Sequence, residues 1–150
     1  MYDTETFDRD VRLHVYRHFV QTGQPPTVTQ TAAALGSLLP EVEAAYRRLA
    51  QSRVLVLDPA SLHIRMAMPF SAVPTAFRIE AAGRSWWANC AWDALGVPAL
   101  LAGTASIFSH CGDCEEPLTL TVERGVLGKT NAVCHFAVPA AHWWDDIDFT

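Results

Sequence analysis

Cys90 and Asp93 are the two residues whose types and spacing most directly suggest chemistry. They lie three positions apart at the predicted start of a helix, and a helix places residues three apart on one face, so we expect the thiol and the carboxyl side by side. Asn89 is a favourable N-cap, and a thiol in the first turn feels the positive end of the helix dipole, so Cys90 is expected to ionise more readily than a free cysteine. The pattern predicts a reactive or metal-binding thiolate beside a proton donor. The plain alternative is a small buried thiol that fills a helix face.

Three tryptophans, Trp86, Trp87 and Trp92, accompany this pair in the sequence. An apolar surround suits an apolar substrate group, and it raises the pKa of a neighbouring carboxyl such as Asp93 toward a value useful for acid catalysis. The sequence therefore predicts a substrate pocket built from these three side chains, although tryptophan clusters also form ordinary protein cores.

The remaining cysteines are Cys111, Cys114 and Cys134. Cys111-Gly-Asp-Cys114 has the spacing of a zinc or redox motif, but a zinc ribbon needs a second such pair, and a redox motif needs a helix start within a βαβ unit. Our first interpretation is a turn whose thiols have no joint role, and a metal site is the second. His110 and His135 complete such a site only if the fold brings them close.

The overall composition is that of a globular chain. It has 150 residues, of which 50% are hydrophobic and 18% charged, with a formal net charge of -5. This length suits one ordinary domain or two small ones, and the negative charge weighs against sequence-independent binding to nucleic acid. No segment reaches the length of a membrane span, and the acidic N-terminus does not resemble a secretory signal. We therefore expect a cytoplasmic protein without a membrane partner, whose cysteines are free, catalytic or metal-binding.

Residues 1–70 are predicted to form a three-helix, winged-helix-like module. Apolar spacing, a Thr27–Gln30 capping box and a proline in a first turn indicate the helices, and two β-prone runs follow them. The predicted elements are helices over residues 4–21, 27–36 and from Pro40 onward, and strands over residues 54–57 and 63–68. The charges of the third helix cancel, which favours a structural module over a DNA-binding one. They belong to Glu41, Glu43, Arg47 and Arg48.

After a predicted linker over residues 69–74, residues 75–150 are expected to form a mainly β domain around one central helix. The helix begins at Asn89, and Pro98 kinks it or ends a turn. The predicted strands cover residues 75–81, 106–109, 118–122 and 133–138. The fold class is therefore α+β.

Several of these segments resemble the organomercurial (alkylmercury) lyase family. Residues 87–101, with Asn-Cys-Ala-Trp-Asp followed by Pro-Ala-Leu-Leu, are similar to that family's active-site segment, and Ser109-His-Cys111 and residues 117–122 are similar to its next strands. The resemblance implies protonolysis of a carbon–mercury bond. Cys90 is then the first mercury-binding thiolate, Asp93 handles the proton, and Cys111 is a buried structural thiol. No cofactor is implied; Hg(II) is the metal of substrate and product, and external thiols remove it.

The chain departs from this family at its C-terminal end. The family carries a second catalytic cysteine in a strand that, by position, begins at Trp143, and residues 143–150 contain no cysteine. Three explanations stay open. The native chain continues past Thr150, or Cys134 substitutes, or the scaffold serves another reaction. In the last case Cys90 and Asp93 act as a lyase, isomerase or cyclase on a biosynthetic metabolite, assisted by Asp145, Asp146 and Asp148.

A further hypothesis is a winged-helix regulator that senses metals or thiol-reactive ligands through Cys90, Cys111 or Cys114.

Overall fold

The computed structural model describes residues 3–148, and its first part contains the three expected helices. These are α1 (Thr4–Thr22), α2 (Val28–Leu35) and α3 (Leu39–Gln51). The predicted capping box is confirmed, because the Thr27 hydroxyl accepts from the Gln30 backbone N–H at 3.1 Å and the Gln30 side chain accepts from the Thr27 backbone N–H at 2.8 Å. α1 buries Val11, Val15 and Phe19, four residues apart, against the other helices and the sheet.

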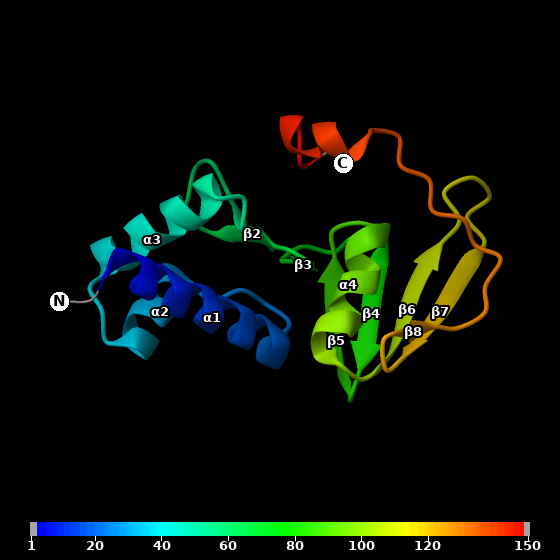
Figure 1. Ribbon diagram of the computed structural model, residues 1–150, viewed down its shortest axis with the longest axis horizontal. Helices are drawn as coiled ribbons and strands as arrows, with labels where there is room; N and C mark the ends of the chain where they lie inside the picture. The colour runs from blue at the N-terminus through cyan, green and yellow to red at the C-terminus, as the bar shows by residue number, and fades with distance from the viewer. Residues whose placement is uncertain (1–2, 149–150) are drawn as a thin grey trace.

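The strands form one eight-stranded sheet in the order β1-β2-β3-β5-β4-β6-β7-β8, in which every pair of neighbours is antiparallel. α4 (Ala91–Leu101) packs on β4, β5 and β6, and η1 (Ala140–Asp145) is a short 3-10 helix. The strands are β1 (Leu55–Leu57), β2 (Ile64–Ala67), β3 (Phe70–Ser71), β4 (Phe77–Ala81), β5 (Arg84–Ala88), β6 (Thr104–His110), β7 (Pro117–Glu123) and β8 (Val126–Leu127). Figure 1 shows the three N-terminal helices on one side, with α4 and the larger strands on the other. The predicted α+β class is confirmed.

The predicted linker is wrong, because residues 70 and 71 form the buried strand β3. Phe70 and Ser71 are 0% and 1% exposed. Ser71 pairs with Met66 of β2, and Phe70 pairs with Ala88 of β5. The flanking prolines suggested a linker, but proline is compatible with the ends of a short strand. The division into modules 1–70 and 75–150 stays a prediction, and the two parts share one sheet.

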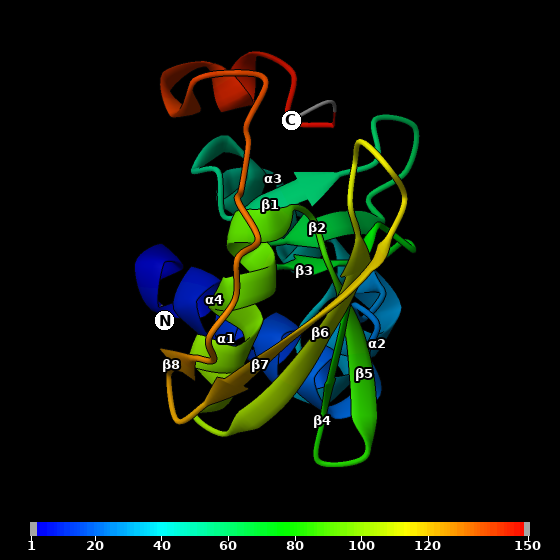
Figure 2. The ribbon, with the colours of Figure 1, turned by 90° about the vertical axis from the view of Figure 1, so that its right-hand side faces the viewer.

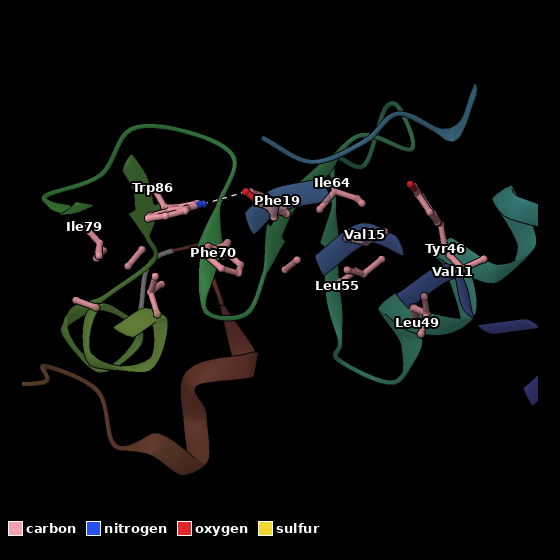
Figure 3. Packing of buried hydrophobic residues seen from close by; sticks show 14 of the residues in the cluster. Val11, Val15, Phe19, Tyr46, Leu49, Leu55, Ile64, Phe70, Ile79 and Trp86 are labelled. Carbon is pink, nitrogen blue, oxygen red and sulfur yellow. Dashed lines mark hydrogen bonds between the residues drawn. The ribbon is translucent and has the colours of Figure 1, made fainter. Parts of the chain in front are cut away.

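One hydrophobic core runs through both parts, and Phe70 lies at its centre (Figure 3). The Phe70 ring stacks on Phe19 of α1, with centroids 5.2 Å apart and planes inclined by 11°. The indole N–H of Trp86 on β5 donates to the backbone carbonyl of Phe19 at 2.9 Å. Burying a phenylalanine of this kind stabilises a fold by about 1.5–3 kcal/mol, so these contacts bind the helices firmly to the sheet.

The structure also corrects the sequence predictions beyond β7. Residues 133–138 were expected to form a strand, but residues 128–139 have no regular structure. The outer edge of β7 is occupied by β8, through pairs such as Val122 with Leu127, and the chain then turns back across the molecule to η1 (Figure 1). The strand expected to begin at Trp143 is instead part of η1, and Phe149 and Thr150 lie outside the described residues. Strand β5 was not predicted.

No helix within residues 3–148 is both long enough and apolar enough to cross a bilayer.

Candidate active site

Cys90 lies between the end of β5 and the start of α4. It is the N-cap residue of α4, in an extended conformation with φ -147° and ψ -177°. The expectation that Asn89 is the N-cap is therefore wrong by one residue. The helix continues through Pro98 to Leu101, and its first turn carries Asp93.

The thiol of Cys90 and the carboxyl of Asp93 interact directly, as their spacing predicted. The two side chains lie within hydrogen-bonding reach of each other. Burial raises the pKa of Cys90, an effect that the backbone N–H groups of Asp93 and Trp92 partly oppose. Burial likewise raises the pKa of Asp93. The expectation of a readily ionised thiol is therefore wrong, because the loss of water around the sulfur outweighs the helix N-terminus. Both groups favour their neutral forms.

Asn89 fixes the position of Asp93. Its Nδ2 group donates to Asp93 Oδ2 at 3.0 Å and lies 3.2 Å and 3.3 Å from the backbone carbonyls of Phe70 and Pro69. Met68 Sδ is also within 3.3 Å. The Asn89 Oδ1 atom is buried and has no hydrogen-bond partner among the described residues. The amide thus ties the carboxyl on α4 to the segment around β3.

Tyr16 of α1 reaches the same region from the N-terminal half. Its hydroxyl donates to the backbone carbonyl of Met68 at 2.7 Å. Burial raises the pKa of Tyr16, and the negative charge of Asp93 raises it further. Sequence reasoning missed Tyr16, because 52 positions separate it from Met68 and no local pattern indicates the contact. The N-terminal helices therefore contribute to the surroundings of Asp93.

A cavity of about 240 Å³ opens beside Cys90. Its wall is mostly apolar and is formed by the start of α4, the start of β4 and the returning C-terminal segment. The lining residues are Phe77, Asn89, Cys90, Ala91, His135, Phe136, Ala137, Val138 and Trp143. Phe136 and Trp143 pack with ring centroids 5.1 Å apart, and Trp143 Nε1 donates to the Val138 carbonyl at 2.8 Å. The residues that were expected to form a strand thus form a wall of the cavity.

The three tryptophans of the predicted pocket lie elsewhere. Trp86 is 4% exposed in the core and Trp92 is 66% exposed on the surface. Trp87 is half-buried on β5, and none of the three lines the cavity. Trp143 provides the indole there. Asp93 is not in the cavity wall either; its carboxyl lies beside the thiol of Cys90, which is a lining residue.

The other three cysteines are free thiols, of which Cys111 and Cys114 share one turn and Cys134 lies apart from them in the sequence. Cys134 is exposed, directly before His135 of the cavity wall. Cys111 is half-buried and Cys114 exposed, both in the turn between β6 and β7. Within residues 3–148, no three His, Cys, Asp or Glu side chains gather as ligands for a metal ion.

The aspartates suggested as substitutes for the missing thiol point to other partners. Asp145 contacts His142 at 2.9 Å, and Asp148 pairs with Arg65 of β2 at 2.8 Å. Asp146 also has a partner within the chain. None of the three lines the cavity beside Cys90.

A half-buried thiol and a half-buried carboxyl thus lie together at the start of α4, beside an apolar cavity, and these two groups have the chemistry of a sulfur ligand and a proton donor. The sequence profile of the alkylmercury lyase family matches residues 70–150, more than half of the chain. The protein belongs to the alkylmercury lyase family, which confirms the resemblance.

A solved structure, the mercury-bound form of MerB2, is similar with a TM-score of 0.63 and 25% sequence identity. The match covers 85% of this chain and 66% of the other, so the chain spans less than two thirds of that protein's length. No curated protein matches the chain.

Proposed function

We propose that the protein cleaves the carbon–mercury bond of organomercurials by protonolysis, with Cys90 as the sulfur ligand and Asp93 as the proton donor. The observation that carries this proposal is the contact of the two groups, the pKa of each raised by burial, beside an apolar cavity. Membership of the alkylmercury lyase family supports the same chemistry.

The reaction needs one proton, and the Cys90–Asp93 pair supplies it. When the mercury of a substrate R–Hg–X binds Cys90, the thiol proton passes to the adjacent Asp93 carboxylate and a sulfur–mercury bond forms. Sulfur is a soft ligand suited to a soft metal. Asp93 then protonates the carbon, and the carbon–mercury electron pair becomes the new C–H bond. Overall, R–Hg–X and the Cys90 thiol give R–H and a Cys90–S–Hg–X adduct, without oxidation or reduction.

The Hg(II) product leaves by thiol exchange. External thiols displace mercury from Cys90 and return a proton to its sulfur, so a reducing compartment such as the cytoplasm suits the enzyme. Within the chain, Cys134 is the candidate for the second sulfur, because its neighbour His135 lines the cavity. Its exposed thiol is free to exchange.

The test is a turnover assay with phenylmercuric acetate in excess thiol. We expect release of benzene and Hg(II) by the wild-type protein, and loss of benzene release in Cys90→Ser and in Asp93→Asn. Glu123→Gln, which removes an exposed carboxylate on β7, is the matched control and should retain activity. Tight binding of the mercurial without benzene release would overturn the proposal and leave a mercurial-binding protein.

A second candidate is a lyase, isomerase or cyclase on the same scaffold that acts on a non-mercurial metabolite. His135 in the cavity wall favours it, since an imidazole beside Cys90 offers another acid–base group.

The regulator hypothesis has less support, because arginines near α3 are engaged inside the chain. Arg48 makes a two-point ion pair with Asp8, with bonds of 2.7 Å and 2.6 Å. Retention of a specific DNA fragment in a gel shift at physiological salt would revive that hypothesis.

A further inference from the structure

The turn between β6 and β7 holds two cysteines in a tight, hydrogen-bonded loop. β6 ends at His110, which pairs with Pro117 at the start of β7. Inside this pair, the Cys111 N–H donates to the Glu116 carbonyl at 2.8 Å, and the Glu115 N–H donates to the Cys111 carbonyl at 2.9 Å. These bonds close the loop and fix the backbone that carries both thiols.

Several hydrogen-bond donors of this loop lie around the Cys111 sulfur. The N–H groups of Cys114 and Asp113 hydrogen-bond to that sulfur, and so does the Cys114 thiol. The Cys114 thiol is therefore adjacent to the Cys111 sulfur, and Cys114 is exposed to solvent. Two neighbouring sulfurs with backbone N–H donors aimed at one of them form a ready-made thiolate ligand pair.

We propose that Cys111 and Cys114 form a two-thiolate site for a soft metal ion with a preference for two-coordinate sulfur ligation, of which Hg(II) is the representative. Two thiolates neutralise the charge of a divalent ion, and Hg(II) is satisfied by two sulfur ligands. On binding, each thiol loses its proton and forms one metal–sulfur bond, so the site releases two protons per ion and no group changes oxidation state. Because Cys114 is exposed, the metal ion can reach the site from solvent through the Cys114 thiol.

The place of this site in the sheet relates it to Cys90. β5 and β6 are both antiparallel to β4, and Arg78 of β4 pairs with Trp87 of β5 and with Phe108 of β6. Cys90 comes three residues after Trp87, and Cys111 comes three residues after Phe108. The chain therefore carries both cysteines out of the sheet at the same end of these strands. Only β4 lies between β5 and β6. Because neighbouring strands lie about 4.8 Å apart, β5 and β6 are about 10 Å apart. Figure 2 shows the β6–β7 loop projecting at the upper end of these strands.

The metal site stands on the geometry of the loop alone. A role for it as acceptor of the Hg(II) released at Cys90 rests, in addition, on the proposed lyase function.

The test uses the full chain with Cys90→Ser and Cys134→Ser, which leaves Cys111 and Cys114 as its thiols. HgCl₂ is first titrated without added thiol, and the protons released are measured. A competing monothiol is then added, the protein is separated from it by gel filtration, and the Hg(II) and the mercury–thiolate charge-transfer absorption retained on the protein are measured. We expect one Hg(II) per chain and two protons per Hg(II). Adding Cys114→Ser should abolish the retained absorption. This background lacks Cys90, so its result is independent of lyase activity.

Gly112→Ala is the matched control, because a Cβ at that position meets no atom within 4 Å and should leave Hg(II) retention unchanged. Far-ultraviolet circular dichroism checks that each variant is folded. Loss of all Hg(II) to the competing thiol in the variant that keeps Cys111 and Cys114 would overturn the inference. Equal retention after Cys114→Ser would overturn it as well, since one sulfur would then suffice.

Discussion

At the scale of single residues, the proposed reaction requires Cys90 and Asp93 to share one proton. Burial raises the pKa of both groups, and the ordinary pKa of a thiol lies well above that of a carboxyl. Between these values the pair carries one proton, which is the number that protonolysis requires. Below the pKa of Asp93 the pair holds two protons and the sulfur cannot bind mercury as thiolate; above the pKa of Cys90 it holds none and the carbon receives no proton.

We therefore predict a bell-shaped pH profile of kcat/KM for a mercurial substrate. Its acid limb should lie above the usual range of an aspartate, and its alkaline limb above that of a free cysteine. Steady-state rates measured across pH check this. A profile that rises to a plateau in alkaline solution without a descending limb would contradict the assignment of the proton to this pair.

Asn89 is a positioning residue, and Asn89→Ala tests this role. The Asn89 amide lowers the pKa of Asp93, so its removal should move the acid limb of the pH profile to higher pH and reduce kcat more than it changes KM. The variant also leaves the carbonyls of Pro69 and Phe70 without their donor, which we expect to cost about 1–3 kcal/mol of stability. A loss of stability with an unshifted acid limb would assign Asn89 a purely structural role.

The candidate site was predictable from sequence only where its residues are neighbours in the chain. The spacing of Cys90 and Asp93 placed them together, and the resemblance gave them a chemistry. The sign of the Cys90 pKa shift was not predictable, because it depends on burial by residues far away in sequence. Tyr16 and the contacts of Asn89 with Pro69 and Phe70 were missed for the same reason.

At the scale of elements, the C-terminal segment over residues 135–143 acts as the outer wall of the cavity. Trp143→Ala removes its indole and the contact with Phe136. Aromatic pairs contribute about 0.5–1.5 kcal/mol, so we expect KM for phenylmercury to rise by about 2- to 12-fold, with a smaller change for methylmercury. Steady-state kinetics with both substrates measure the difference.

Trp144→Ala is the control for that variant. Trp144 is the adjacent residue, but its ring lies under the Arg53 guanidinium at 5.4 Å and is not part of the cavity wall. Equal effects of the two substitutions on KM would contradict the role of Trp143 as a wall residue.

Elements with strong periodicity or caps were predicted well, and irregular ones were not. α1 to α3 were located by apolar spacing and by the Thr27–Gln30 capping box. β3 was overlooked because it is two residues long and lies between prolines, and its strand character comes from pairing on both sides. Residues 133–138 have the alternation of a strand, but their apolar side chains cover the cavity and do not extend the sheet.

At the scale of the whole molecule, the shared core predicts that both halves unfold together. Phe70→Ala removes a ring that packs on Phe19, and deletion of a buried phenylalanine costs about 3–5 kcal/mol. We expect one urea transition at lower denaturant concentration. Helix content by circular dichroism and tryptophan fluorescence should follow the same curve. Separate transitions for the two signals in the wild-type protein would show that the halves are independent.

The hydrogen bond from Trp86 to the Phe19 carbonyl has a consequence for how such a chain can diverge. It joins residues 67 positions apart, and the Phe70 ring packs beside it. A recombination event that exchanged the helical half for an unrelated one would therefore expose apolar side chains of the half that carries Cys90. We therefore expect substitutions at positions 19, 70 and 86 to be coupled, and the helical half to be inherited together with the half that carries Cys90.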